Sequence, residues 1–175
     1  MFTETELDNI LNWLPYRADW KVDRNSNDDL TNNYIKKLIG DFSENPCFKL
    51  LVTHNGGMSN YLEFVCYPAI QDTYAGDAII VLISLCAPMA TYGQIDISIK
   101  PKYTGHNGFQ AEQAGIVASF ELIEIELEVK RLLSNSNILI LDREYLIKPL
   151  PKGKIISNDF LLGNQYLHGI FQQAD

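Results

Sequence analysis

Four residues that follow the most apolar stretch of the chain are of types that line small-molecule sites. They are Tyr92, Tyr103, His106 and Asn107. Together they would supply aromatic walls, a titratable imidazole and an amide, which are groups that commonly orient a bound ligand. The last three belong to a polar segment, 101–113, that contains two glycines and little apolar content. If the chain binds a small molecule, we therefore expect the site at this segment; the alternative is an ordinary surface loop.

Three other patterns could do chemistry, and each lacks an essential element. The acidic stretch Asp23–Asp29 offers oxygen ligands at alternate positions, but its sixth position is Asp28, where a calcium loop needs glycine, and its twelfth is Tyr34 instead of glutamate. Ser59 begins like a nucleophile elbow without the closing glycine. The histidines have no partner at the spacing of metal ligands. We predict no catalytic residue, metal or cofactor, and expect a protein that is not an enzyme.

A cluster of aromatic residues lies near the N-terminus. It consists of Trp13, Tyr16 and Trp20. The cluster follows a segment whose apolar residues recur at helical spacing and which ends at Pro15. Such rings bury large apolar areas, so they either cover a core or contact a partner. We expect a packing role, and these three residues are our candidates for a partner contact, with a second copy of the chain as one alternative.

The charge balance limits the classes of partner. The 175 residues include 22 acidic and 14 basic side chains, which give a net charge of −8 at pH 7. This charge repels nucleic-acid phosphates and anionic lipids, so we expect neither nucleic acid nor a membrane surface as a partner. A basic protein fits better. Because the first ten residues contain acids where a secretory signal has bases, we expect a cytoplasmic protein.

The predicted sheet is organised around the apolar run Ala78–Ala90. This run contains one polar residue, Ser84, and is interrupted by Pro88, so it predicts a strand that is buried on both faces and ends near that proline. It is shorter than the roughly 20 residues that span a bilayer. In segment 94–100, isoleucines alternate with polar residues, which predicts a half-buried strand antiparallel to the first.

A hairpin is the most strongly indicated local structure. Asn55-Gly56 stands between the apolar runs 47–54 and 60–67, and this dipeptide favours the tight turns that join antiparallel strands. Further short strands are expected at 138–141 and 165–172. The three cysteines are odd in number and widely spaced, so we expect reduced core residues and no disulfide framework. They are Cys47, Cys66 and Cys86.

Helices are expected on both sides of the hairpins in the sequence. The apolar residues from Leu30 to Phe42 recur at helical spacing, and Asp142 is placed to cap one or two helical turns. Segment 116–135 is ambiguous, because its apolar residues fit both the period of two of a strand and the period of a helix. Its acids precede its bases, as a helix dipole prefers, and we predict one long helix near 117–134.

These patterns predict a single α+β domain over residues 1–175. Its N-terminal helical part covers about 1–45, and the part from about 46 to 175 holds a mostly antiparallel sheet of about five or six strands with helices packed against it. We expect a non-catalytic cytoplasmic interaction protein that binds a basic protein through an acidic surface. Immunity proteins, which inhibit toxins, share this size and charge without a shared motif. The alternatives are a small-molecule-binding module or enzyme with its site near 101–113, and a homo-oligomeric subunit.

Overall fold

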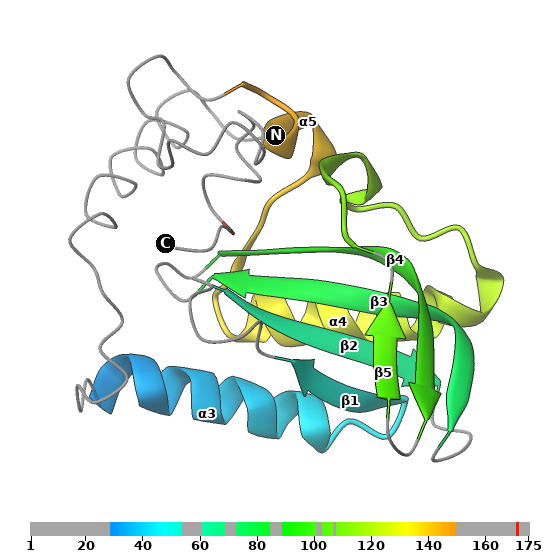
Figure 1. The fold of residues 1–175 in the computed structure, drawn as a ribbon. Coiled ribbons are helices and arrows are strands. Elements are labelled where there is room, and N and C mark those ends of the chain that lie inside the picture. Colours follow the sequence, from blue (N-terminus) through cyan, green and yellow to red (C-terminus); the bar gives the residue numbers. More distant parts are fainter. Residues whose placement is uncertain are drawn as a thin grey trace.

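The computed structural model describes residues 29–53, 61–68, 73–84, 89–100, 103–106, 108–149 and 171. In them, helices pack against one mostly antiparallel sheet, which is the α+β arrangement that the sequence predicts (Figure 1). The strands are β1 (Phe48–Thr53), β2 (Tyr61–Pro68), β3 (Tyr74–Ser84), β4 (Met89–Lys100), β5 (Tyr103–His106) and β6 (Leu139–Ile140). The helices are α3 (Asp29–Ser43), α4 (Ile123–Asn135) and α5 (Arg143–Leu146), with 3-10 turns η1 (Ala111–Gln113) and η2 (Phe120–Leu122).

The sheet is a meander in which β1 to β5 lie side by side in sequence order. Each of these strands is antiparallel to its neighbour, and the short β6 pairs in parallel with the start of β4. The predicted pairing of the two runs around Asn55-Gly56 is confirmed, with Leu51 opposite Val65 in the β1–β2 ladder. Alternating side chains in each strand therefore face opposite sides of the sheet.

β3 is the buried central strand, but its bounds differ from the prediction. It begins at Tyr74, includes polar residues before the apolar run, and ends at Ser84, before Pro88. β4 begins at Met89 and not at residue 94, so the second part of the apolar run belongs to it. Both strands are longer than predicted because they pair with each other over ten positions. Their backbone hydrogen bonds continue beyond the apolar residues from which the strands were predicted.

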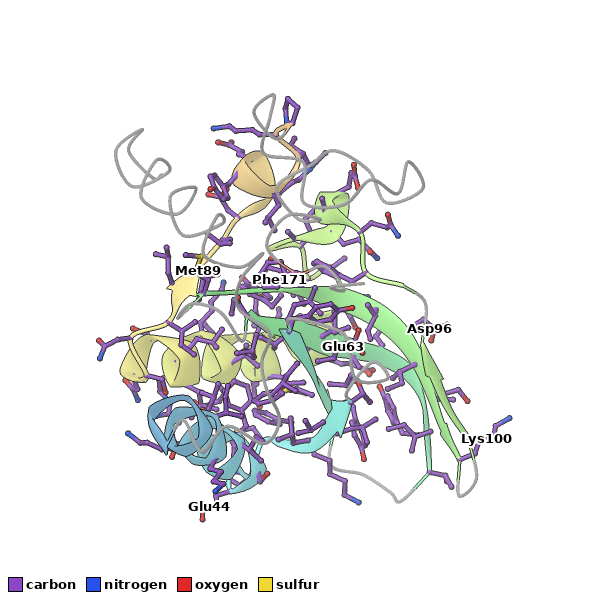
Figure 2. All side chains as sticks on the ribbon, turned by 60° about the vertical axis from the view of Figure 1, so that its left-hand side comes forward. Glu44, Glu63, Met89, Asp96, Lys100 and Phe171 are labelled. Carbon is purple, nitrogen blue, oxygen red and sulfur yellow. The ribbon has the colours of Figure 1, made fainter. Side chains whose placement is uncertain are left out.

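Each face of the sheet has its own hydrophobic core. Figure 2 shows α3 and α4 together under one face, with α5 beyond the other. The helix-side core is made by residues of α3, α4 and alternate positions of β2, β3 and β4, and includes Leu38, Phe42, Phe64, Ile79, Val81, Tyr92, Ile125 and Val129. The opposite core includes Val65, Ile80, Ile95, Ile97, Ala111, Leu141, Leu146 and Phe171. Two covered faces explain why β3 reads as a continuous apolar run.

The helix predicted near 117–134 is confirmed as α4, although it begins at Ile123. The residues just before it form the 3-10 turn η2, whose Leu122 is buried. Ile125, Val129 and Leu133 are buried on one side of α4, as helical spacing requires. The predicted Asp142 cap is also confirmed, because its carboxylate accepts the Tyr145 N–H at 3.0 Å.

The predicted loop 101–113 is wrong in part. Residues 103–106 form strand β5, which pairs with the end of β4, and residues 111–113 form η1. β5 has the sequence Tyr-Thr-Gly-His, which has no apolar alternation, so its pairing partner and not its own pattern makes it a strand. Cys47 is exposed and lies before β1, which corrects its expected place in the core, whereas Cys66 is buried as predicted.

The outer edge of β4 is occupied by three segments in turn. β6 pairs with its first residues and β5 with its last four, 97–100. Between these strands the Gly115 N–H donates to the Tyr92 carbonyl at 2.7 Å, and the Gln94 N–H donates to the Ile116 carbonyl at 3.1 Å. The edge of β4 thus gains partners that an open edge strand lacks.

Several predictions lie outside the described residues. These are the N-terminal helix, the Asp23–Asp29 loop, Ser59, Cys86, Asn107, and the aromatic cluster of Trp13, Tyr16 and Trp20. Of the strand predicted at 165–172, only Phe171 is described, and its ring packs edge-on against Tyr61 at 6.4 Å between centroids.

Candidate partner-binding surface

Three of the predicted ligand-binding residues, Tyr92, Tyr103 and His106, lie at separate positions along the sheet, and the fourth, Asn107, lies outside the described residues. Tyr92 lies in the middle of β4, opposite Val81, whereas His106 lies opposite Ile97 at the far part of the same strand. Tyr103 pairs with Lys100, still further along. Five residues of β4 separate Tyr92 from the position opposite His106, which is about 16 Å at ~3.3 Å per residue. The small-molecule site near 101–113 stays a prediction, and Tyr92 has another role.

Tyr92 connects β4 to α4 through a side-chain hydrogen bond. Its ring is buried, and its hydroxyl donates a hydrogen bond to Oε1 of Glu126 at 2.9 Å. Lys130 Nζ lies 2.7 Å from the same oxygen and 5.5 Å from the centre of the Tyr92 ring. The hydrogen bond to Glu126 is the main cause that raises the pKa of Lys130, and burial is the main cause that raises the pKa of Tyr92. These three side chains hold one another in place, so we assign them a structural role.

Gly93 and Gln94 hold the segment that leads into α4 against the sheet. A Cβ at Gly93 would lie 2.4 Å from the Gln113 carbonyl oxygen and 2.7 Å from the Phe109 ring, so glycine allows this close crossing. The Gln94 carboxamide oxygen accepts the N–H groups of Ala118 and Ser119, at 2.8 and 2.9 Å. The residues just before η2 are therefore fixed beside β4.

Two aspartates face each other next to this crossing. Asp77 of β3 lies directly opposite Asp96 of β4. Each is an even number of residues from the helix-side core residues of its own strand, so both belong to the helix side of the sheet. Opposite residues in such a pair have Cβ atoms about 5 Å apart, a spacing at which two like charges are destabilising. Figure 2 shows Asp96 and Lys100 at separate points on the outer part of β4. They are four residues apart in this strand, which corresponds to about 13 Å. Sheets usually avoid two carboxylates at opposed positions because their repulsion lowers stability. The pair therefore suggests a role other than stabilising the fold.

Tyr74 and Glu121 lie near the two opposed aspartates. Its hydroxyl folds over Gly76 and donates to the Asp77 carbonyl at 2.6 Å. Burial is the largest cause that raises the pKa of the Tyr74 phenol. The negative charges of Asp77, Glu121 and Asp96 raise this pKa further. Glu121 reaches this region because η2 lies against β3 (Figure 1).

We define the acidic surface as Asp77, Asp96, Glu121 and Glu124. Asp96, Glu121 and Glu124 are exposed, and Glu124 follows Glu121 by one turn at the start of α4. Within the described part of the chain, none of the four carboxylates forms an ion pair. The acids at the helix start also favour the positive end of the α4 dipole, which accounts for part of their placement. It does not account for the opposed aspartates on the sheet.

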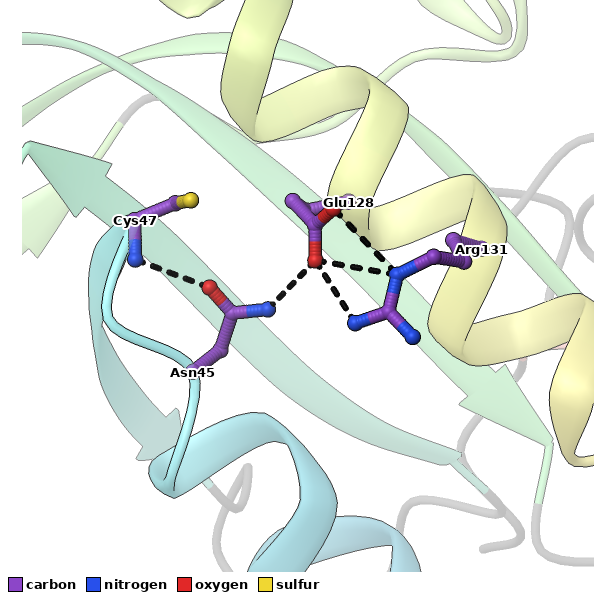
Figure 3. A network of polar contacts seen from close by, with 4 residues as sticks. All are labelled: Asn45, Cys47, Glu128 and Arg131. Carbon is purple, nitrogen blue, oxygen red and sulfur yellow. Dashed lines mark hydrogen bonds and ion pairs between the residues drawn. The ribbon is translucent and has the colours of Figure 1, made fainter.

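The other two glutamates of α4 are neutralised by bases. Glu126 is bound by Lys130, and Glu128 accepts hydrogen bonds from Arg131, the shortest of them 2.7 Å. Figure 3 shows that Glu128 also accepts a hydrogen bond from the Asn45 amide at 2.7 Å, while the Asn45 oxygen accepts the Cys47 N–H at 2.8 Å. Bonds from Arg131 and then Asn45 lower the pKa of Glu128. This network ties the end of α3 to α4, so it is structural.

Features of other functional classes are not found among the residues that the structure describes. No group of three or more histidine, cysteine, aspartate or glutamate side chains is placed to hold a metal ion there. Burial raises the pKa of the Cys66 thiol, which keeps it protonated and unreactive. None of the helices in these ranges has the length and apolar character needed to cross a bilayer.

Comparisons with known proteins give no independent guide to function. No family model matches the chain, no curated protein matches its sequence, and no solved structure matches its fold. The acidic surface is therefore the feature from which we infer a function. The sequence pattern did not identify any of the four carboxylates as part of a site. The opposition of Asp77 and Asp96 depends on the β3–β4 register, which the sequence pattern alone does not fix.

Proposed function

We propose that the chain is a non-catalytic interaction protein that binds a basic protein partner through the acidic surface, in the manner of an immunity-type inhibitor. The observation that carries this proposal is the set of four carboxylates with no ion pair within the described residues, two of them directly opposed on the sheet. Like charges held together create a local negative potential that attracts a basic protein and speeds its capture.

The charge of the whole chain supports the same partner class. A net charge of −8 adds a long-range attraction toward a basic protein, and the local carboxylates then give that attraction a direction. Two of the three glutamates of α4 are bound to bases, whereas Glu124 and the preceding Glu121 of η2 are not, so the charge available to a partner lies at the start of the helix. We propose that this binding takes place in the cytoplasm.

The test is capture of a partner followed by kinetics with the purified pair. The full-length chain is immobilised, cell extract from its source is applied at low salt, and retained proteins are eluted with salt and identified. We expect a basic protein, and an association rate between the purified proteins that falls steeply as ionic strength rises. Retention of no basic protein at low ionic strength would contradict the proposal.

A charge-matched pair of variants locates the surface. The test variant carries Asp96→Asn, Glu121→Gln and Glu124→Gln, whereas the control neutralises three exposed acids elsewhere. The control changes are Glu44→Gln, Glu112→Gln and Glu144→Gln. Both variants lose the same net charge, so a difference between them reports position. We expect the test variant to slow association by about tenfold and the control to slow it much less. Equal effects would mean that net charge alone attracts the partner.

A further inference from the structure

Three large apolar side chains are exposed next to the acidic surface. Phe120 is 86 % exposed, Leu127 is 60 % exposed and Ile123 is 42 % exposed. They follow one another at intervals of three and four residues, so they lie along one side of η2 and α4. We call these three residues the apolar stripe. Single exposed apolar residues are common on proteins, but a contiguous set beside charged residues is typical of an interaction site.

The apolar stripe is not needed to pack α4 on the sheet. The opposite side of the helix supplies the core contacts, through Ile125, Val129, Leu132 and Leu133, all of which are buried. The stripe is therefore a second apolar side on a helix that already has one. A helix that is only a structural support has polar residues at such positions.

The charges beside the apolar stripe select its partner. Glu121 and Glu124 lie among its residues and form no ion pair in the described part of the chain. The neighbouring bases of α4, Lys130 and Arg131, are already paired with Glu126 and Glu128. A ligand that covers the stripe thus meets apolar side chains flanked by negative charge. The complementary ligand has an apolar side flanked by positive charge.

We propose that the apolar stripe binds the apolar side of a basic amphipathic helix, with the lysines or arginines of that helix against Glu121 and Glu124. This inference rests on the proposed function, because it specifies which kind of basic partner the acidic surface receives. Burial of the exposed Phe120 ring supplies affinity, and the flanking charges supply orientation. A second copy of this chain is disfavoured as the occupant, because each copy would bring its own glutamates to the contact.

The test uses two synthetic peptides of identical composition and calorimetric titration of the full-length chain. One leucine–lysine peptide has leucines at i, i+3, i+4 and i+7, and the other has the same residues in an order with no apolar side. We expect the first peptide to bind and to become helical, and the second to bind at least tenfold more weakly. Equal affinity for the two peptides would overturn the inference, since charge alone would then explain binding.

Substitutions of exposed apolar residues inside and outside the apolar stripe locate the contact. Phe120→Ser and Leu127→Ser should each weaken binding of the amphipathic peptide by about tenfold or more, which corresponds to ~1.4 kcal/mol. Leu139→Ser and Ile147→Ser, which remove side chains that are 36 % and 37 % exposed elsewhere, should change the affinity by less than about twofold. An unchanged affinity in both stripe variants would overturn the assignment, whatever the peptide does to the wild-type chain.

The outcomes separate this inference from the proposed function. If binding of the captured basic protein requires Glu121 and Glu124 but not Phe120, the proposed function is supported and the role of the apolar stripe is overturned. If the peptide binds through Phe120 and ignores both glutamates and salt, the charge argument fails for both proposals. Sedimentation supplies the third outcome. Self-association of the wild-type chain that Phe120→Ser abolishes would make a second copy the occupant and overturn the inference.

Discussion

The hydroxyl of Tyr92 donates a 2.9 Å hydrogen bond to Glu126, which joins the buried middle of the sheet to the helix that covers it. The acceptor is a carboxylate that also binds Lys130, so the bond is assisted by charge. We predict that Tyr92→Phe lowers the free energy of unfolding by about 1–2 kcal/mol, because one such bond is lost while the ring stays packed. Urea denaturation measures this change. Leu127→Ser is the control, since its exposed side chain has no core role. A Tyr92→Phe midpoint equal to that of the control would show that the bond adds no stability.

We predict that substitution by alanine has opposite effects on stability at Gly93 and at Gly40. At Gly93 a Cβ would overlap the Gln113 carbonyl, so Gly93→Ala should displace the 109–119 segment and cost about 1–3 kcal/mol. At Gly40, within α3, a Cβ meets nothing within 4 Å, so Gly40→Ala should stabilise by about 0.5–1 kcal/mol. Thermal unfolding measures the two signs, and hydrogen exchange should show faster exchange in residues 109–119 of Gly93→Ala alone. Stabilisation by both substitutions would contradict the close crossing.

The lowered pKa of Glu128 leads to a prediction about the loss of folding stability at acid pH. Hydrogen bonds from Arg131 and Asn45 hold its pKa below the usual 4.5, so the folded state binds this proton less readily than the unfolded chain. The resulting stabilisation is present above pH 4.5 and is lost as the pH falls through the lowered pKa. In Glu128→Gln this part of the acid dependence should disappear.

The measurement for Glu128 is the urea midpoint at a series of pH values from neutral into the acid range. Wild-type chain and Glu144→Gln, which changes an exposed glutamate on α5, should lose stability with similar steepness below pH 4.5. Glu128→Gln should lose it less steeply. If all three curves have the same slope, the hydrogen bonds in Figure 3 do not persist in solution.

The parts of the fold that were predicted correctly are those with a local signal. Asn55-Gly56 between apolar runs identified the β1–β2 pair, and the helical period of the buried α4 residues outweighed the competing period of two. The acids at the start of that segment were a second signal, and they lie in the first turn of α4. Local patterns suffice where one segment decides its own structure.

The parts that were missed depend on contacts between distant segments. β5 is a strand because β4 offers it an edge, and Tyr74 to Asp77 extend β3 because 96–99 lie opposite. The β4–β5 register also lay beyond the sequence pattern, and it pairs Tyr103 and His106 with the end of β4, away from Tyr92. The acidic surface is a further example, because only the register brings Asp77 opposite Asp96.

The start of β4 has an unpaired outer edge during synthesis of the protein, because the segments that cover this edge are made later. β3 and β4 can pair as soon as both have left the ribosome, but the start of β4 finds its partner in β6 and in Leu141, 50 residues beyond Thr91. At roughly 5–20 residues per second, translation of those residues takes about 3–10 s. During that interval an apolar strand edge is open to other nascent chains. Substitutions that loosen β6 should therefore reduce the yield of folded protein in the cell more than they reduce its stability once it is made.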